Sequence, residues 1–568
     1  MSINSAVTEA AARPYSRWRT GVVRAVIAVG LFVFTFFLRF NTLGGALGGF
    51  DDDHFVSFAY AKQVQAGARP LQDFTGLGLQ SAWPPLTYDV SALAQSLLGN
   101  NLRSEALLAV TGIGLATVLA FLASTYVAPI AVAGGAAVVS ALLATRLYNY
   151  PKVLALGAAM LLIALYARTP SRASLAALAL LSAVAFLFRH DLAVYIGIGC
   201  VTAVIATAGA LRPAVPRLLG YLSLCALLLA PSAIYIQLHG GMGAYVQDTV
   251  AAVRQEARRT ERLNLGFVSR GEDGRQLSAL EFLREERNAV QWLYYAHVAL
   301  PLIVLAAALR PSRPRWPGSR PLLVAWGVMA LVITPFFLRG NTGARFGDMA
   351  PVTAALLSVV CARAFHREGH LLSIVGRAGL AVVALLLSAQ SVWAVGEVTH
   401  DLDVSGWRHS PIAVIRQAAR RWGELAALPD AYWQGTPESP SVAAVQYLHG
   451  CTRPTDRILV ISYRPELLPL ADRRFAGGRA SVIPGLLTDP AHQQLLVERW
   501  ARESVPLVLV EPAEEHVYEI PVAYAHLIDH YVDSGPLPVN GGLTLHVYAE
   551  RGRPTSGTFG PDVLPCFR

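Results

Sequence analysis

Residues 22–54 read VVRAVIAVGLFVFTFFLRFNTLGGALGGFDDDH, and this stretch sets the plan of the chain. The apolar run over 22–40 is long enough to cross about 30 Å of hydrocarbon as a helix. Four arginines within 13–24 indicate a cytoplasmic N-terminus, and the absence of a small-residue cleavage site predicts an anchor. The acidic cluster Asp51 to His54 follows at the opposite surface, where charge faces water, a cation or a substrate. From this stretch alone, a solvated loop and a functional site fit equally well.

The composition places the whole chain in the polytopic membrane class. Hydrophobic residues make up 54% and charged residues 15% of the 568 residues, and the mean hydropathy is +0.43, which is too apolar for a soluble globular protein. The net charge of +9 is almost all arginine, because only Lys62 and Lys152 are lysines. These arginines lie mostly in short segments between apolar runs, where membrane orientation explains them. Nucleic acid is therefore not an expected partner.

Eleven apolar stretches of roughly 16 to 24 residues have the length of transmembrane helices. They lie near 22–40, 105–126, 128–145, 153–167, 172–188, 192–209, 218–236, 291–309, 321–338, 350–365 and 378–396. Threaded from a cytoplasmic segment at 1–21, four short arginine-bearing connections fall on the cytoplasmic side, as the positive-inside rule requires: 168–172, 212–217, 310–320 and 366–377. We predict a membrane domain over 22–396 with external loops 41–104 and 237–290. The arginine bias suggests a GC-rich bacterium, so the predicted location is a bacterial cytoplasmic (inner) membrane.

The tail has a different composition. Residues 397–440 combine an Arg- and Trp-rich stretch, expected to lie along the interface, with a Pro- and Gly-bearing linker from Leu428 to Pro440. Residues 441–568 alternate helical patterns with apolar strands, which predicts an external α/β domain. The expected helices lie over 441–450 and 490–503, and the expected strands over 457–463, 506–511 and 543–548. The sequence contains no glycine-rich phosphate loop and no internal repeat.

The cysteines divide by compartment. Cys451 and Cys566 both fall in the exported domain, where an oxidising environment permits a disulfide between them. Cys200, Cys225 and Cys361 fall inside predicted spans and are expected to pack as small apolar residues. No CxxC or HExxH pattern is present, so no structural zinc site is indicated.

The first external loop carries an ordered set of features over 48–90, GGFDDDHFVSFAYAKQVQAGARPLQDFTGLGLQSAWPPLTYDV. They are the acidic pair Asp52 and Asp53, a helix with Ala59 and Ala61 running to Gly67, the pair Asp73 and Phe74, and the box Pro84, Pro85, Leu86, x, Tyr88. In this order the loop resembles the GT-C superfamily of polyprenyl-phosphate-dependent membrane glycosyltransferases, particularly the protein O-mannosyltransferases and lipid A aminoarabinose transferases. The resemblance is strongest over 38–100, extends in topology to about 396 and is generic in the tail.

The resemblance implies a GT-C-like fold and transfer of a sugar from a polyprenyl phosphate to a hydroxyl group. Spacing back from Gly67 favours Asp52 as the counterpart of the family's catalytic acidic residue, with Asp53 as its neighbour. Asp51 is an additional aspartate, since the family's pair is commonly Asp-Glu. A carboxylate suits a base that takes the acceptor proton. We predict a single displacement with inversion, in which Asp52 is that base.

Departure of a lipid phosphate requires cationic groups, and arginine presents a fork that matches phosphate oxygens. The external segments offer four cations for the donor phosphate: Arg146, Lys152, Arg189 and Arg345. The side chains expected to contact substrate are His54, Asp73, Tyr88, Tyr148, His190 and Asp191. Structural alternatives stay open, since a cation at a span end can snorkel to the headgroups and Arg189 can pair internally with Asp191.

Two further hypotheses concern a lid and a metal. Loop 237–290 mixes Arg and Glu at helical spacing, which is typical of a solvated amphipathic face, with a lid hinged at Gly266 and Gly271 as the alternative. Some relatives use a divalent cation, and Asp51, Asp53 and His54 would be ligands for Mg, Mn or Ca. A hydrogen bond from His54 to a neighbouring carboxylate is the alternative.

The sequence therefore predicts a glycosyltransferase, transferring a hexose or pentose from a polyprenyl-phosphate donor to an envelope glycan, lipid or exported protein at the extracytoplasmic face. One alternative is a transporter or flippase of an envelope lipid or glycan, although the charges gather at one face instead of the midplane. The other is a noncatalytic envelope-assembly protein with a GT-C core, against which the intact acidic pair argues. The role of the tail stays open.

Overall fold

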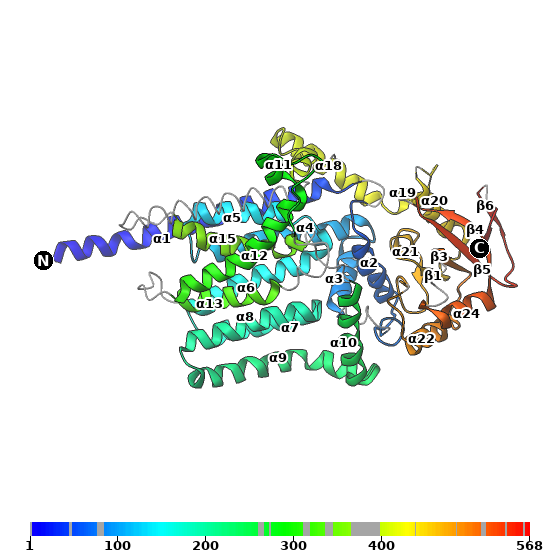
Figure 1. Ribbon diagram of the computed structural model, residues 1–568, viewed down its shortest axis with the longest axis horizontal. Helices are drawn as coiled ribbons and strands as arrows, with labels where there is room; N and C mark the ends of the chain where they lie inside the picture. Colours follow the sequence, from blue (N-terminus) through cyan, green and yellow to red (C-terminus); the bar gives the residue numbers. More distant parts are fainter. Residues whose placement is uncertain are drawn as a thin grey trace.

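A computed structural model describes residues 3–44, 48–76, 84–259, 266–271, 274–309, 319–334, 345–364, 398–434, 436–437, 439–483, 485–512, 519–539, 542–560 and 563–568. It consists of a bundle of long helices with a smaller α/β domain at one end (Figure 1). Within the described residues the order is that expected from the sequence, with the apolar helices first and the α/β domain last.

The long helices show a multi-pass membrane protein. They are α1 (Ile3–Thr42), α4 (Leu102–Ser124), α5 (Ile130–Leu143), α6 (Tyr150–Arg168), α7 (Arg172–Phe188), α8 (His190–Ala208), α9 (Leu211–His239), α12 (Glu286–Leu309), α13 (Ser319–Ile333) and α15 (Ala350–Ala364). Among the described residues, six have the length and apolarity to cross a membrane: Gly21–Thr42, Leu102–Ser124, Leu147–Arg168, His190–Ala208, Leu211–His239 and Glu286–Leu309. Helices α5, α7, α13 and α15 are apolar but shorter, and the predicted span at 378–396 lies outside the described residues. Eleven spans therefore stays a prediction.

Small residues allow the membrane helices to approach closely. At Gly157 in α6, an added Cβ would come within 3.0 Å of the Ala116 carbonyl oxygen in α4. Such contacts between backbones are a main source of helix association in a membrane, where lipid is as apolar as leucine. A buried ion pair adds to this packing, because the Arg39 guanidinium of α1 lies 2.6 Å from the Asp401 carboxylate.

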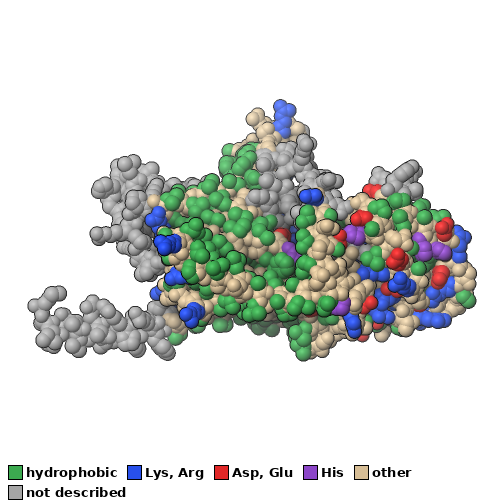
Figure 2. Space-filling model, turned by 90° about the horizontal axis from the view of Figure 1, so that it is seen from below, with side chains coloured by type: hydrophobic (Ala, Val, Ile, Leu, Met, Phe, Trp, Pro, Cys, Tyr) green, Lys and Arg blue, Asp and Glu red, His purple; other side chains and the backbone are tan. Residues whose placement is uncertain are grey.

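The character of the surface changes from one end of the helix bundle to the other. A broad hydrophobic surface covers the helices, Lys and Arg side chains line the end away from the α/β domain, and both signs of charge cover the α/β domain (Figure 2). The candidate span that contains α6 runs from Leu147 to Arg168 and has 22 residues, about 33 Å at 1.5 Å per residue, which is enough to cross the hydrocarbon.

Shorter helices cover the end of the bundle next to the α/β domain. They are α2 (Asp52–Gln65), α3 (Leu86–Leu98), the 3-10 helices η2 (Leu147–Asn149) and η4 (Gly347–Met349), α10 (Met242–Arg259), α11 (Ala279–Arg284), α17 (Val398–Val404), α18 (Pro411–Ala427) and α19 (Asp430–Trp433). In α18, Ile412, Ile415 and Trp422 are exposed, as the predicted interfacial segment requires.

The predicted linker from Leu428 to Pro440 is packed against its surroundings where the structure describes it. The Leu428 carbonyl accepts a hydrogen bond from the Leu102 amide at 3.1 Å. The Trp433 indole donates to the Leu470 carbonyl at 2.8 Å. This segment therefore ties the α/β domain to α4 instead of leaving it on a loose tether.

The tail forms a five-stranded mixed sheet with the order β2-β1-β3-β5-β4. Its strands are β1 (Arg457–Ile461), β2 (Arg474–Phe475), β3 (Leu507–Val510), β4 (Tyr531–Pro538) and β5 (Thr544–Glu550), and a separate ribbon pairs β6 (Gly557–Phe559) with β7 (Leu564–Cys566). β1 pairs in parallel with β2 and β3, whereas β5 is antiparallel to both neighbours. The helices are α20 (Pro440–Cys451), α21 (Leu467–Leu470), α22 (Pro490–Trp500) and α24 (Pro521–His530). The expected α/β class is thus confirmed, and β2 and β4 are additions.

The two regions share one hydrophobic core. Phe55 and Phe58 of α2 belong to the same buried cluster as Leu467 and Phe475 of the tail. Polar contacts reinforce it, since the Lys62 ammonium lies 2.9 Å from the Asp472 carboxylate and the Thr75 amide donates to the Gly478 carbonyl at 3.0 Å. The first external loop and the tail therefore form one rigid unit.

Cys451 and Cys566, the expected pair, are joined by a disulfide between the end of α20 and β7. We expect Cys566→Ser to lower stability by about 2–5 kcal/mol, because the unfolded chain regains the freedom that the cross-link removes. Thermal unfolding of the detergent-solubilised protein measures this loss. Cys451→Ser in the same background should add little, and a second loss of equal size would contradict the assignment.

Candidate active site

Asp51, Asp52 and Asp53 lie together at the N-terminus of α2. Asp51 precedes the first turn, which contains Asp52 and Asp53, and the amide groups of a helix N-terminus favour negative charge there. Asp51 is exposed, whereas Asp52 and Asp53 are half-buried. Helix α2 lies between the membrane helices and the α/β domain (Figure 1). Asp52 and Asp53 therefore lie partly covered where the two parts of the protein meet, with Asp51 at the solvent side.

The α/β domain contributes to this cluster through the loop that follows β1. The Tyr463 hydroxyl donates a hydrogen bond to the Asp53 carboxylate. The charge of Arg464 acts on Asp52, and Glu466 lies near enough for Asp52 to act on it. Sequence reasoning missed these residues, although the carboxyl end of a parallel strand is a common place for ligand-binding side chains.

Two of the three carboxyl groups, Asp51 and Asp52, are more basic than ordinary carboxylates. Burial raises the pKa of Asp52, and the like charges of Asp53 and Asp51 add to the effect, whereas Arg464 opposes it. Partial desolvation by the surrounding protein also raises the pKa of Asp51, although its side chain still contacts solvent, and Arg146 opposes this effect. A carboxylate with a raised pKa is a better proton acceptor while ionised, which suits a general base.

Arg146 lies beside the aspartates on the loop before α6. Its guanidinium is 4.6 Å from the centre of the Tyr148 ring, and its charge acts on Asp51. Tyr148 in turn lies within electrostatic range of Asp53. The structure therefore places Arg146 within electrostatic range of Asp51 and Tyr148 within electrostatic range of Asp53, and their roles at the site stay a prediction.

Two of the predicted phosphate-binding cations are instead engaged in ion pairs. The Lys152 ammonium lies 2.8 Å from the Asp348 carboxylate, and both side chains are buried. Arg189 makes two hydrogen bonds of 3.1 Å to Asp191, and the charges of both act on Lys152. The internal-pair interpretation therefore holds for Arg189 and Asp191. Lys152 joins α6 to η4 through this pair, because a buried charge requires a partner, and its predicted contact with the donor phosphate stays a hypothesis.

The remaining polar candidates on the membrane helices lie around this network. The His190 ring is 2.9 Å from the Tyr245 hydroxyl of α10, so it joins α8 to α10. Arg345 is half-buried immediately before η4, which carries Asp348.

Tyr88 and Asp73 serve the fold of the first loop. Tyr88 is only 2% exposed, and its ring centre lies 5.8 Å from that of Tyr60 and 5.7 Å from that of Phe74. The Asp73 carboxylate accepts the Arg69 amide at 2.7 Å in an exposed turn. In this structure Tyr88 therefore packs in the core and Asp73 closes a turn, and their predicted substrate contacts stay a hypothesis.

His54 points into the helix bundle and away from the aspartates' solvent side. It is 3% exposed, and its Nε2 lies 2.9 Å from the Glu105 carboxylate of α4. Glu105 also accepts hydrogen bonds from Ser91 at 2.5 Å and Gln95 at 2.7 Å. Across the described residues, no three His, Cys, Asp or Glu side chains are arranged to hold a metal. The described positions of Asp51, Asp53 and His54 form no such group, and Glu105 occupies only the Nε2 side of the imidazole, so a cation on this set stays a hypothesis.

The loop over 237–290 is partly described. Asp248 of α10 lies 3.2 Å from His492 of α22, so α10 rests against the α/β domain. Arg275 and Glu281 form an exposed pair at 2.5 Å, as expected of a solvated face. The hinge at Gly266 and Gly271 stays a hypothesis, since residues 260–265 and 272–273 lie outside the described residues.

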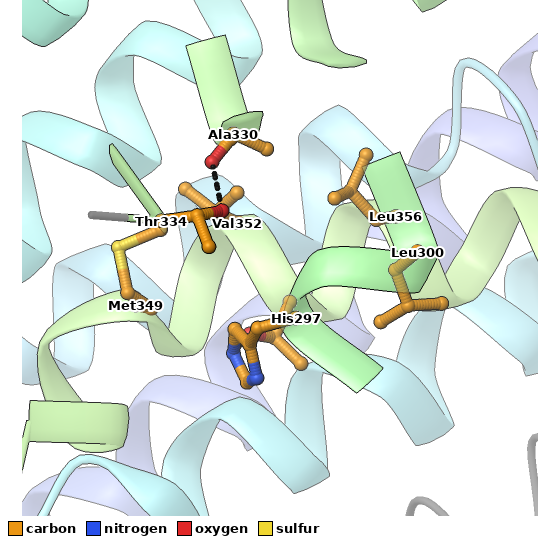
Figure 3. Close-up of a pocket in the computed structure, with 8 residues that line it drawn as sticks. His297, Leu300, Ala330, Thr334, Met349, Val352 and Leu356 are labelled. Atoms are coloured by element: carbon orange, nitrogen blue, oxygen red, sulfur yellow. Dashed lines mark hydrogen bonds between the residues drawn. The ribbon is translucent and has the colours of Figure 1, made fainter. Parts of the chain in front are cut away.

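A small cavity lies within the bundle, lined by residues of α12, α13, η4 and α15 (Figure 3). Its lining is apolar except for His297, Thr334 and Thr353. The His297 ring is already bonded to the Leu293 carbonyl at 2.8 Å and to the Thr353 hydroxyl at 2.7 Å. None of Asp51, Asp52 and Asp53 lines this cavity.

Glu466 provides a test of the site's electrostatics. It is 2% exposed, and burial raises its pKa to about 7, outweighing Arg464 at 3.9 Å. Because the folded state holds this proton more tightly than the unfolded state, stability should fall as pH rises from about 4.5 to about 7. Glu466→Gln mimics the protonated group, so its stability advantage should grow to about 3 kcal/mol across this window. Thermal unfolding of both proteins between pH 5 and 8 measures this, and parallel curves would contradict it.

Comparison with known proteins gives a likeness in structure alone. No protein-family model and no curated protein sequence matches the chain. The chain is similar to the oligosaccharyltransferase of Archaeoglobus fulgidus, a GT-C superfamily glycosyltransferase. Against its apo form the TM-score is 0.43 at 14% identity, covering 88% of this chain and 72% of that chain. Against the form with Zn and sulfate the TM-score is 0.42 at 15% identity, covering 92% and 73%.

A third structure of that enzyme, AglB in complex with an inhibitory peptide and a dolichol-phosphate, gives a TM-score of 0.39 at 13% identity, covering 94% of this chain and 75% of that chain. With TM-scores below 0.5, these likenesses carry no argument about function. An argument about function must therefore come from the residues of the candidate site.

Proposed function

We propose that this chain is a membrane glycosyltransferase that uses a polyprenyl-phosphate sugar donor. The observation that carries the proposal is the acidic N-terminus of α2, held between the membrane helices and the α/β domain with Arg146 beside it. Carboxylates next to an arginine at a membrane surface suit a reaction that removes a proton and releases a phosphate. The resemblance of the first external loop to the GT-C superfamily supports the same reaction.

In the proposed reaction the acceptor hydroxyl oxygen forms a bond to the anomeric carbon while the bond from that carbon to the donor phosphate oxygen breaks. Asp52 takes the hydroxyl proton, and the electron pair of the broken bond leaves with the lipid phosphate. Asp53 is positioned by Tyr463, and Arg146 binds the phosphate as its charge grows. Attack from the face opposite the leaving group inverts the anomeric carbon.

The proposed orientation places the site at the extracytoplasmic face. Arg168 ends α6 and Arg172 begins α7 at the end of the bundle away from the aspartates, where Figure 2 shows Lys and Arg side chains. Positive charge on short connections marks the cytoplasmic side. The acceptor would then be an envelope glycan, a lipid or an exported protein of a bacterial inner membrane.

Sugar transfer by the purified full-length protein tests the proposal. The protein would be placed in lipid nanodiscs with radiolabelled polyprenyl-phosphate hexoses and pentoses, and an envelope extract from a strain lacking the protein would supply acceptors. We expect label to move from the lipid to one acceptor class. Movement of intact labelled lipid across a vesicle membrane without transfer would instead indicate a flippase.

A further inference from the structure

The loop after β1 holds an arginine at the aspartates that neither the composition nor the motif of the first loop indicates. Arg464 is half-buried, with 26% of its side chain exposed, and its charge acts on Asp52. Its nearest carboxylate partner by distance is Glu466, whose oxygen is 3.9 Å from the guanidinium, longer than a hydrogen bond. Arg464 therefore keeps hydrogen-bonding capacity at the site.

The loop that carries Arg464 is held rigidly on both sides. Ser462 donates to the Glu511 carboxylate at 2.7 Å, and Tyr463 donates to Asp53. After Arg464, the buried residues Leu467 and Leu468 of α21 anchor the chain in the core shared with α2. A side chain on such a support is placed with little conformational cost when a ligand binds.

Arg464 and Arg146 approach the acidic cluster from different parts of the protein. Arg146 belongs to the membrane domain and acts on Asp51, whereas Arg464 belongs to the α/β domain and acts on Asp52. Lys152 and Arg189, by contrast, are matched by Asp348 and Asp191. Two guanidinium groups beside three aspartates form an arrangement that can take an anionic group and release a proton in one place.

We propose that Arg464 binds the phosphate of the lipid-linked donor together with Arg146, so that the α/β domain is part of the catalytic site and not only a cap or a docking module. This inference rests on the proposed function, and it names a residue of the tail as a substrate ligand. Arg464 contributes the fork that matches phosphate oxygens. Removal of the tail's contribution should therefore weaken donor binding even when the membrane domain is intact.

The test measures binding of undecaprenyl phosphate to the full-length protein in nanodiscs, with undecaprenol as the probe that lacks phosphate. We expect Arg464→Ala to weaken binding of undecaprenyl phosphate at least about tenfold, and Arg464→Lys to weaken it by about threefold because the charge stays and the fork is lost. Binding of undecaprenol should stay unchanged in both. Arg502→Ala, at an exposed arginine of the same domain, is the matched control and should bind as the wild type does.

The possible outcomes distinguish a failure of this inference from a failure of the proposed function on which it rests. If the wild type prefers undecaprenyl phosphate and Arg464→Ala binds it equally well, the inference fails and the glycosyltransferase proposal stands. If the wild type binds both probes alike, the proposed function itself fails. Binding and thermal unfolding are measured for both Arg464→Gln and Arg464→Ala. The conclusion is drawn from whichever of these uncharged variants is folded. Loss of binding only in unfolded variants would show a structural role and overturn the inference.

Discussion

Replacing Asp52 with asparagine is expected to lower the rate of sugar transfer by about 10²- to 10⁴-fold, the usual contribution of a general base. The substitution keeps the size and the polarity of the side chain but removes its ability to accept the acceptor proton. Because Asp52 is half-buried at a helix N-terminus beside two other carboxylates, loss of its charge relieves repulsion. The variant should therefore fold at least as well as the wild type, with donor binding largely kept.

The control for this variant is Asp529→Asn, at an exposed aspartate of α24. It should transfer sugar at the wild-type rate. Asp53→Asn should lose less activity than Asp52→Asn, because Asp53 is engaged by Tyr463. Transfer assays with labelled donor in nanodiscs measure all three. Full activity in Asp52→Asn would remove the base from the mechanism.

Removing one partner of the Lys152–Asp348 pair is expected to cost about 3–5 kcal/mol of stability, because an unpaired charge would be left buried. The two side chains are 2.8 Å apart and at most 10% exposed. Lys152→Met alone removes the cation from Asp348, and Asp348→Leu alone removes this carboxylate from Lys152. Thermal unfolding in detergent should therefore show a large fall for each single variant.

The double variant Lys152→Met with Asp348→Leu distinguishes a structural pair from a phosphate ligand. With both charges gone, stability should return to within about 1–2 kcal/mol of the wild type. It should also bind undecaprenyl phosphate as the wild type does, since Arg146 and Arg464 supply the cations of the proposed site. A stable double variant that no longer binds the phosphate lipid would restore Lys152 to the donor site.

Much of the architecture was readable along the chain because it depends on local pattern. Apolar runs predicted the positions of the apolar helices α1, α4 to α9, α12, α13 and α15, and alternation of helix and strand predicted the tail's class. The acidic cluster after the first span was visible because charge next to hydrocarbon is rare. The disulfide followed from two cysteines in the domain that the sequence predicts to be exported.

The roles of individual charges were less accessible. Lys152 and Asp348 are 196 residues apart, so no local pattern pairs them. Tyr88 belonged to a motif, yet its ring lies in the core, because a conspicuous aromatic box serves packing as readily as binding. His54 stood beside three aspartates in the sequence, but helix geometry turned it toward Glu105.

The sequence by itself determined that this is a membrane protein with an acidic site after its first span, since hydropathy and the cost of charge in lipid act residue by residue. Only the tertiary structure decided which cations remain at that site. A charge that the fold buries requires a partner of opposite charge. Lys152 therefore forms an ion pair with Asp348, and Arg189 forms one with Asp191. The same packing brought Tyr463 to the N-terminus of α2, where it bonds to Asp53, a residue 410 positions away along the chain. It also brought Arg464 within electrostatic range of Asp52.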